Sequence, residues 1–203
     1  MESGPRLRVR LGASLAFCLA IAAAVAPSAI AQDRASTPFL SAASDGAARP
    51  SFTAQAEAAG LTADQARTLQ GEVDRYLATL GGTQVSPNKI DLNGRGAAFI
   101  SLPGENHPRN FTPMLGTQSV ACPYGAFCAY SQEGMTGSQI NMTFCSSYAL
   151  PGWGEVGSWD NNQTPGTSAR MIDNNGRVID SSGPAHNMNY HYDWSPVWWV
   201  DPC

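Results

Sequence analysis

The cysteines constrain this chain more than any other feature. The stretch CPYGAFCAY, residues 122–130, closes a loop of seven residues between Cys122 and Cys128, with a proline and a glycine inside it. Structural zinc sites usually use cysteines two to four residues apart, completed by a second pair or by histidines. A redox pair normally has two residues between its cysteines. Neither spacing occurs here, so the pattern favours a structural disulfide in an oxidising compartment.

The N-terminus predicts export to such a compartment. The segment MESGPRLRVR is basic, an apolar run from Leu11 to Val25 follows, and small residues precede Gln32. This order is typical of a secretory signal peptide, here cleaved between Ala31 and Gln32. The apolar run is shorter than the roughly 20 residues that span a bilayer, so we expect a secreted, extracellular protein with no membrane association after cleavage.

The charge balance excludes a class of partner. Without residues 1–31 the chain keeps nine of its 12 basic and 15 of its 16 acidic residues, a formal charge of −6, and Lys89 is its only lysine. A nucleic-acid-binding surface needs a stripe of basic side chains that neutralise phosphates. We therefore expect no nucleic-acid partner.

Cleavage also removes Cys18 and leaves four cysteines, all within the last 82 residues. An even number in an exported chain indicates two disulfides, with three possible connectivities. A bond between Cys122 and Cys128 should contribute about 2 to 2.5 kcal/mol to stability on the chain-entropy model. The complementary bond between Cys145 and Cys203 closes 59 residues, and it should contribute roughly 4 kcal/mol. We predict this pair of bonds.

Composition divides the chain into segments. Residues 32–59 are rich in alanine, serine, proline and glutamine, which is typical of a flexible leader. The predicted segments are the signal peptide (1–31), the leader (32–59), a helix plus hairpin (60–102), a linker (103–121) and a β domain (122–203).

The segment GLTADQARTLQGEVDRYLATLGG predicts an amphipathic helix. Thr62 and Gln65 form a capping box, and Gly81 ends the helix. Its apolar stripe consists of Ala66, Leu69, Val73, Leu77 and Leu80. The next segment, KIDLNGRGAAFISL, predicts two strands around an Asn-Gly turn. Because these elements bury little surface alone, they either pack on the C-terminal domain or form a pro-segment.

The C-terminal segment predicts a mainly β fold. Short strand signals are broken by turns in AFCAYS, SQINMTFC, ARMID, RVID and PVWWV. The pair Asn175-Gly176 is a strong hairpin signal between two of them. Turn residues recur every 8 to 12 residues, which is typical of a small β-sandwich or Greek-key domain.

No catalytic motif is present, so we expect no enzyme. The chain has no Gly-x-Ser-x-Gly elbow, no His-Glu-x-x-His motif and no phosphate-binding loop. Large aromatic side chains usually fill the core of a small β domain, and exposed ones can bind carbohydrate. The tryptophans that either fill the core or bind carbohydrate are Trp153, Trp159, Trp194, Trp198 and Trp199.

The stretch CPYGAFCAYSQEGMTG resembles the start of the βγ-crystallin-like domain of small secreted bacterial peptidase inhibitors, the metalloproteinase-inhibitor type, which also begins Cys-Pro-x-Gly-x-x-Cys. The hairpin signature of that fold is aromatic-x4-aromatic-x-Gly. Tyr130 and Gly137 match it, and Met135 occupies the second aromatic position. A glycine there allows a positive φ, and the aromatic ring can pack across the hairpin. The resemblance covers about residues 121–203.

The resemblance implies a disulfide-stapled βγ-crystallin-like Greek-key sandwich, preceded by the helix and the hairpin. It also implies a monomeric inhibitor of extracellular metalloproteases that binds them through a rigid loop, since a preorganised loop loses little entropy on binding. In that family the inhibitory loop lies inside a second short cysteine pair, which this chain lacks. No residue is therefore carried over as the reactive site.

The alternative is a non-inhibitory binding or structural module, stabilised by Ca²⁺. A calcium loop of the βγ-crystallin type reads Asn/Asp-Asn/Asp-x-x-Ser/Thr-Ser. Asp160, Asn161 and Thr164 match it, and Pro165 replaces the final serine. A turn that uses Asn and Gly for structural reasons is the other interpretation of this segment. We expect no other cofactor or metal.

Overall fold

The computed structural model describes residues 51–111 and 120–203. The chain divides into two units, Met1–Asp45 and Gly46–Cys203, and all described residues belong to the second. The predicted signal peptide, its cleavage site at Ala31 and Gln32, and most of the predicted leader lie outside the described residues.

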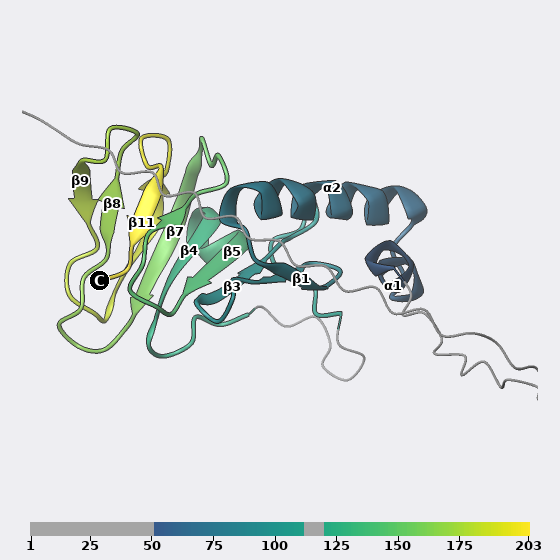
Figure 1. The fold of residues 1–203 in the computed structure, drawn as a ribbon, viewed down its shortest axis with the longest axis horizontal. Coiled ribbons are helices and arrows are strands. Elements are labelled where there is room, and N and C mark those ends of the chain that lie inside the picture. Colours follow the sequence, from purple (N-terminus) through teal and green to yellow (C-terminus); the bar gives the residue numbers. More distant parts are fainter. Residues whose placement is uncertain (1–50, 112–119) are drawn as a thin grey trace, which may run out of the picture. The chain divides into compact units, whose positions relative to one another are not determined.

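The described part of the chain contains two α-helices, one 3₁₀ turn and eleven strands (Figure 1). The helices are α1 (Phe52–Ala58) and α2 (Ala63–Leu80), and the 3₁₀ turn is η1 (Glu133–Met135). The strands are β1 (Thr83–Ser86), β2 (Lys89–Asp91), β3 (Gly96–Phe99), β4 (Ala126–Gln132), β5 (Thr136–Met142), β6 (Tyr148–Ala149), β7 (Val156–Asn162), β8 (Arg170–Ile172), β9 (Val178–Ser181), β10 (Asn187–Asp193) and β11 (Trp199–Asp201).

The strands form two antiparallel sheets, which confirms the predicted mainly β class. The larger sheet has the order β1-β2-β3-β5-β4-β7-β10, and the smaller has the order β6-β11-β8-β9. The sheets exchange strands. Strand β6 follows β5 in sequence yet pairs with β11, and β10 follows β9 yet pairs with β7. This exchange holds the two sheets together as one structure.

Helix α2 begins and ends where the sequence predicts. The Oγ1 atom of Thr62 accepts a hydrogen bond from the backbone N–H of Gln65 at 3.2 Å, and the Oε1 atom of Gln65 accepts one from the N–H of Thr62 at 2.9 Å. Gly81 ends the helix with a φ of 67°. The buried face consists of Ala66, Leu69, Val73 and Tyr76. The predicted stripe left out Tyr76 and included Leu77 and Leu80, which are partly buried.

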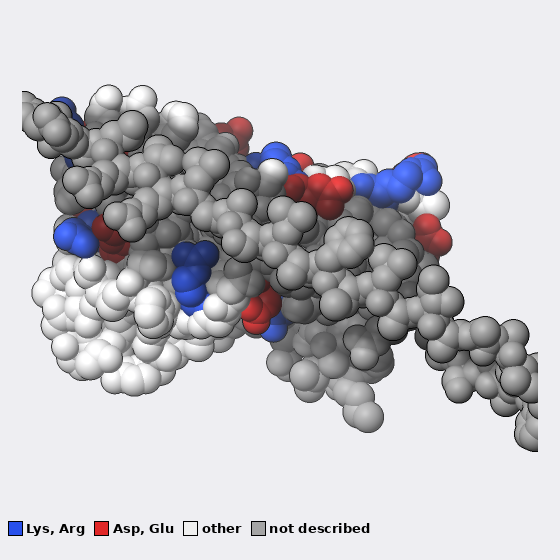
Figure 2. Space-filling model, viewed as in Figure 1, with Lys and Arg blue, Asp and Glu red and all other residues white. Residues whose placement is uncertain are grey.

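The exposed face of α2 carries pairs of opposite charge, which Figure 2 shows as blue and red side chains along the helix. Arg67 contacts Asp64, and Arg75 contacts Glu72 at 2.7 Å. Exposed pairs of this kind contribute only a few tenths of a kcal/mol each. The stability of the helix therefore depends mainly on its buried face.

Helix α1 corrects the prediction that residues 52–58 belong to a flexible leader. The hydroxyl of Ser51 accepts a hydrogen bond from the N–H of Ala54 at 3.2 Å and caps the helix. Ala56 is buried and α1 contacts α2. The sequence pattern hides this helix because its buried position is a single alanine, which shows no apolar period.

The predicted hairpin is present as β2 and β3, and it packs on the C-terminal strands. Strand β3 pairs with β5, with Ala98 opposite Ile140. Both side chains are fully buried in the common core. This segment therefore packs on the β domain, which is one of the two possibilities that the sequence left open.

Trp194 lies in the core and is fully buried. Its Nε1–H donates to the carbonyl oxygen of Tyr130 at 2.9 Å. Its ring centroid lies 4.7 Å from that of Tyr192 and 5.9 Å from that of Trp153, both in edge-on geometry. Such aromatic pairs contribute about 0.5 to 1.5 kcal/mol each beyond the area they bury.

The hairpin signature at Tyr130 behaves as expected. Gly137 has a φ of +79°, in a region that side chains with a Cβ rarely adopt. Tyr130 is buried, and Met135 packs against the cluster that it forms with Ala126 and Cys128. A methionine therefore packs against this cluster where the signature has a second aromatic ring.

Candidate functional site

Both predicted disulfides are present. Cys122 is bonded to Cys128 with a Cα–Cα distance of 5.8 Å, and Cys145 is bonded to Cys203 with a Cα–Cα distance of 5.5 Å. The first bond ties the segment before β4 to β4 itself. The second ties the loop after β5 to the last residue of the chain. Two disulfides are typical of a protein that resides outside the cytoplasm.

The short disulfide encloses a tight turn that displays a tyrosine. The N–H of Ala126 donates to the carbonyl oxygen of Pro123 at 3.2 Å. Gly125, the third residue of the turn, has a φ of +87°, which is the requirement of a type II turn. Tyr124 occupies the second position, and it is 68% exposed. The turn thus holds a large aromatic side chain in solvent.

Two further loops lie beside this turn, at the end of β7 that Asn162 occupies. We call residues 122–126, 162–169 and 182–187 together the loop end. The N–H of Gly125 donates to the carbonyl oxygen of Asn162 at 2.8 Å, and the N–H of Ala185 donates to the carbonyl oxygen of Thr167 at 2.9 Å. None of the three loops contains Lys, Arg, Asp or Glu. Figure 2 shows an area without charged side chains at the lower left, where strands turn in Figure 1.

A buried asparagine fixes two of these loops. Asn161 lies on β7, and its Nδ2 is 3.0 Å from each of three oxygens, the carbonyls of Thr167 and Gly183 and the hydroxyl of Ser182. The same hydroxyl oxygen accepts from the N–H of Ala169 at 2.9 Å. Because these groups are buried, breaking the bonds would leave unpaired polar groups, at a cost of about 1 to 3 kcal/mol each. The loops are therefore held in place before any partner binds.

The ring of Tyr124 contacts a histidine from the third loop. Its centroid lies 6.0 Å from that of His186. The carboxyl group of Asp160 is partly buried, which raises its pKa, and the charge of His186 opposes that shift. Burial raises the pKa of Tyr130, and the negative charge of Asp160 raises it further. Asp160 therefore interacts electrostatically with His186 of the loop end and with the buried Tyr130.

The residues of the predicted calcium loop lie on a strand and in a turn. Asp160 and Asn161 are neighbours on β7, so their side chains point to opposite faces of the sheet. The structure therefore does not bring these two side chains together as ligands. Thr164 is exposed in the following loop. Among the described residues there is no group of three or more His, Cys, Asp or Glu side chains that could hold a metal ion.

The tryptophans divide between core and surface. Trp153, Trp159 and Trp194 are buried, as predicted for aromatic residues of a small β domain. Trp199 is half-buried, and Trp198 is 54% exposed. The exposed ring leaves a ligand-binding role open for this position.

Sequence patterns did not reveal the loop end, although they identified the disulfide that supports it. Loops 162–169 and 182–187 are ordinary turn-forming sequences, and only the pairing of β7 with β4 and β10 brings them to the stapled turn. The one local signal was the glycine in CPYGAFC, which predicts a turn with the tyrosine next to it.

No helix among the described residues is long and apolar enough to cross a membrane. Comparison of the chain with known proteins finds no matching family model, no matching curated protein and no matching solved structure.

Proposed function

We propose that the protein is a secreted peptidase inhibitor, directed at extracellular metalloproteases, that binds its target through the loop end. The observation that carries this proposal is the exposed Tyr124 at the apex of a turn closed by a disulfide. The peptidase as partner comes from the resemblance of residues 121–203 to secreted inhibitors.

The strand order supports the βγ-crystallin-like fold within this proposal. In the group β4 to β7, the fourth strand, β7, lies beside the first, β4. The second strand, β5, lies on the other side of β4. The group β8 to β11 repeats this arrangement with β11, β8 and β9. A fourth strand beside the first is the mark of a Greek key. The third strand of each group, β6 or β10, lies in the sheet of the other group. The two groups therefore have the same arrangement of strands.

The turn would inhibit the peptidase by placing the side chain of Tyr124 in a pocket of the enzyme. Since the turn is closed by a hydrogen bond between Ala126 and Pro123, it does not present an extended, substrate-like backbone. Tyr124 can enter a pocket of the peptidase while the sandwich blocks the cleft around it. Large aromatic anchors of this kind commonly dominate binding energy. The loop end contains no Lys, Arg, Asp or Glu, which avoids the cost of burying such charges unpaired on association.

Inhibition assays with purified peptidases test the proposal. The panel comprises metalloproteases of the thermolysin type and serine proteases, each titrated with the folded, disulfide-bonded protein at up to micromolar concentration. We expect tight inhibition of at least one metalloprotease. Absence of inhibition across the panel would overturn the proposed function.

A matched pair of variants locates the contact. Tyr124→Ala removes the anchor and should weaken inhibition about 10- to 100-fold, as expected for a residue that contributes 1.4 to 2.8 kcal/mol. Trp198→Ala removes a similarly exposed aromatic ring from another loop and should leave inhibition unchanged. If the two variants inhibit equally well, the loop end is not the binding surface.

The second candidate function is a non-inhibitory module stabilised by Ca²⁺. One observation favours it: the side-chain oxygens Oδ1 of Asn161 and Oε1 of Gln163 are buried without a hydrogen-bond partner among the described residues, close in sequence to the predicted calcium loop. A ligand that binds the native state selectively raises the melting temperature. A melting temperature that is the same in millimolar Ca²⁺ and in chelator would exclude this function.

A further inference from the structure

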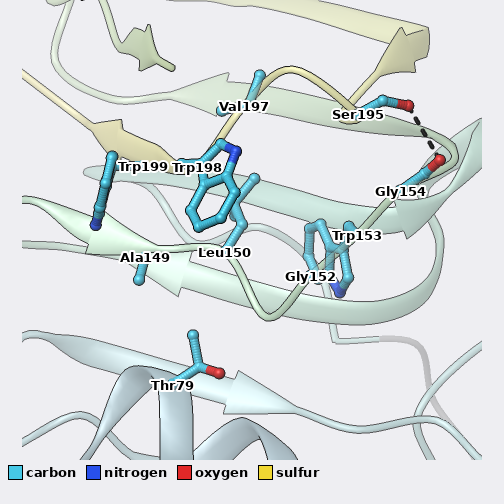
Figure 3. Close-up of a pocket in the computed structure, with 10 residues that line it drawn as sticks. All are labelled: Thr79, Ala149, Leu150, Gly152, Trp153, Gly154, Ser195, Val197, Trp198 and Trp199. Atoms are coloured by element: carbon cyan, nitrogen blue, oxygen red, sulfur yellow. Dashed lines mark hydrogen bonds between the residues drawn. The ribbon is translucent and has the colours of Figure 1, made fainter. Parts of the chain in front are cut away.

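A pocket of about 520 Å³ lies among the described residues at the other end of β7 from the loop end. Figure 3 shows Thr79 of α2 at the bottom, the segment 149–154 across the middle and the segment 195–199 at the top. Its volume falls within the roughly 300 to 1,000 Å³ of typical small-molecule sites. The residues that line it are Thr79, Ala149, Leu150, Gly152, Trp153, Gly154, Ser195, Val197, Trp198 and Trp199.

The exposed ring in this pocket is held by a fixed backbone. The N–H of Trp198 donates to the carbonyl oxygen of Ile172 at 2.8 Å, and the carbonyl oxygen of Trp198 accepts from the N–H of Leu150 at 2.9 Å. Both bonds connect the residue to neighbouring segments on either side. More than half of the Trp198 side chain nevertheless remains in solvent. A large ring that is anchored at its backbone but not covered is a preformed platform for a ligand with an apolar face.

Two hydroxyl groups of the pocket are oriented as acceptors. The hydroxyl of Ser195 donates to the carbonyl oxygen of Gly154 at 3.0 Å, and the hydroxyl of Thr79 donates to the carbonyl oxygen of Arg75 at 3.3 Å. Each hydroxyl hydrogen is used within the protein, so the oxygen lone pairs remain for hydrogen bonds from a ligand. A suitable ligand therefore carries several O–H donors.

The lining contains no charged side chain. An ionised ligand would lose water on entering the pocket and would find no opposite charge there, which is unfavourable. A purely apolar ligand would cover the two hydroxyl oxygens without bonding to them, which also carries a cost. The lining thus selects a neutral molecule with one apolar face and a rim of hydroxyl groups.

We propose that this pocket binds a neutral saccharide. One sugar ring stacks its C–H face on the indole of Trp198, and hydroxyl groups of neighbouring rings donate to the oxygens of Ser195 and Thr79, which lie on opposite sides of the segment 149–154 (Figure 3). The site is separate from the loop end, because seven residues of β7 place about 20 Å between its ends. Binding of a saccharide here is therefore a second function and does not depend on peptidase inhibition.

Isothermal titration calorimetry with defined oligosaccharides tests this proposal on the folded, disulfide-bonded protein. The probes are neutral oligomers of glucose, xylose, mannose and N-acetylglucosamine, an anionic oligogalacturonate and a short apolar peptide. We expect at least one neutral oligomer to bind, with no binding of the anionic oligomer or the peptide. Binding by the anionic oligomer or the peptide alone, or no binding of any neutral oligomer at millimolar concentration, would overturn the proposal.

Three variants decide whether Trp198 carries the binding. Trp198→Ala should weaken the affinity at least tenfold, and Trp198→Phe, which keeps an aromatic face, should retain a measurable part of it. Tyr124→Ala serves as the matched control at the loop end and should bind the saccharide as the unaltered protein does. Circular dichroism melting curves establish that each variant is folded. Equal affinities in Trp198→Ala and the unaltered protein would place the binding elsewhere and refute the assignment.

Discussion

The Nε1–H of Trp153 donates a hydrogen bond of 2.9 Å to the hydroxyl of Tyr76, across 77 positions of the sequence. Both side chains are buried. Nearby, the guanidinium of Arg75 donates to the carbonyl oxygen of Pro151. These bonds attach α2 to the segment between β6 and β7. The helix is therefore a structural part of the β domain, and its removal would open the core.

Replacing the tyrosine tests this connection. In Tyr76→Phe the indole N–H of Trp153 loses its acceptor inside the core, so we expect the free energy of unfolding to fall by about 1 to 3 kcal/mol. Urea unfolding followed by tryptophan fluorescence measures it. Tyr190→Phe removes the hydroxyl of an exposed tyrosine and should change stability by less than about 0.5 kcal/mol. Equal effects of the two variants would show that the buried bond contributes nothing.

A fragment of residues 120–203 should not fold as it does in the full chain. Without β3, strand β5 becomes an unpaired edge, and without α2 the contacts with β6 are lost. Unpaired edges and uncovered cores favour aggregation and loose packing. We expect the fragment to bind a hydrophobic dye and to melt without a cooperative transition, whereas a protein that begins at residue 51 melts cooperatively. A cooperative melt of the shorter fragment would identify residues 51–111 as a dispensable segment.

The two disulfides should differ in their contribution to stability. Replacing Cys145 and Cys203 by serine frees a loop of 59 residues, and the chain-entropy model predicts a loss of about 4 kcal/mol. Replacing Cys122 and Cys128 frees only seven residues, with an expected loss of about 2 kcal/mol. Chemical unfolding of both double variants gives the comparison, and peptide mapping under non-reducing conditions checks the connectivity. A peptide that joins Cys122 to Cys145 would contradict the pairing.

Two glycine-to-alanine changes should act with opposite sign. Gly137 has a φ of +79°, and a Cβ there would lie 2.3 Å from the Oγ atom of Ser131, so Gly137→Ala should destabilise the protein by about 1 to 3 kcal/mol. Gly71 lies on the exposed face of α2 with nothing within 4 Å of an added Cβ. Gly71→Ala should therefore stabilise the protein by about 0.5 to 1 kcal/mol. Thermal melts of the two variants side by side measure both shifts, and a shift of the same sign in both would contradict this account.

Stability should decrease in alkaline solution. Burial raises the pKa of Tyr76, Tyr130 and Tyr192, with negative charges at Asp160 and Asp180 adding to the shifts of the last two. An unfolded tyrosine ionises near pH 10. These groups therefore contribute their full stability below about pH 10, and it is lost as the pH rises towards their folded pKa values.

The free energy of unfolding as a function of pH, combined with the ultraviolet absorbance of phenolate, checks this dependence. We expect part of the phenolate signal to appear only together with unfolding. If all tyrosines ionised near pH 10 while the circular dichroism stayed native, the buried tyrosines would not have raised pKa values.

Local sequence rules predicted the structure correctly where the interacting residues lie close together in the chain. The capping box at Thr62, the terminating Gly81 and the Asn175-Gly176 turn between β8 and β9 depend on residues within one turn of each other. The cysteine pairing followed from number, spacing and expected compartment. Gly137 and its positive φ followed from a hairpin signature of eight residues.

Strands β7 and β10 could not be predicted in this way. The sequence of β7, VGSWDNN, contains Gly, Asp and two Asn, and that of β10, NMNYHYD, contains two Asn and one Asp. These residues are poor strand formers. They are strands because β7 pairs with β4 and β10 pairs with β7. Such pairing depends on residues far away in the sequence, so no local pattern records it.

Both proposed binding sites depend on these two strands. At one end of β7, the two strands place Asn162 beside the turn between Cys122 and Cys128, which completes the loop end. At the other end of β7, they place the segment after β10 against the segment before β7, and these segments line the pocket at Trp198. Local sequence determines helices, turns and disulfides because the interacting groups are close along the chain. The two sites depend on long-range pairing of β7 and β10, whose residues have low strand propensity. The folded core around Trp194 stabilises this pairing.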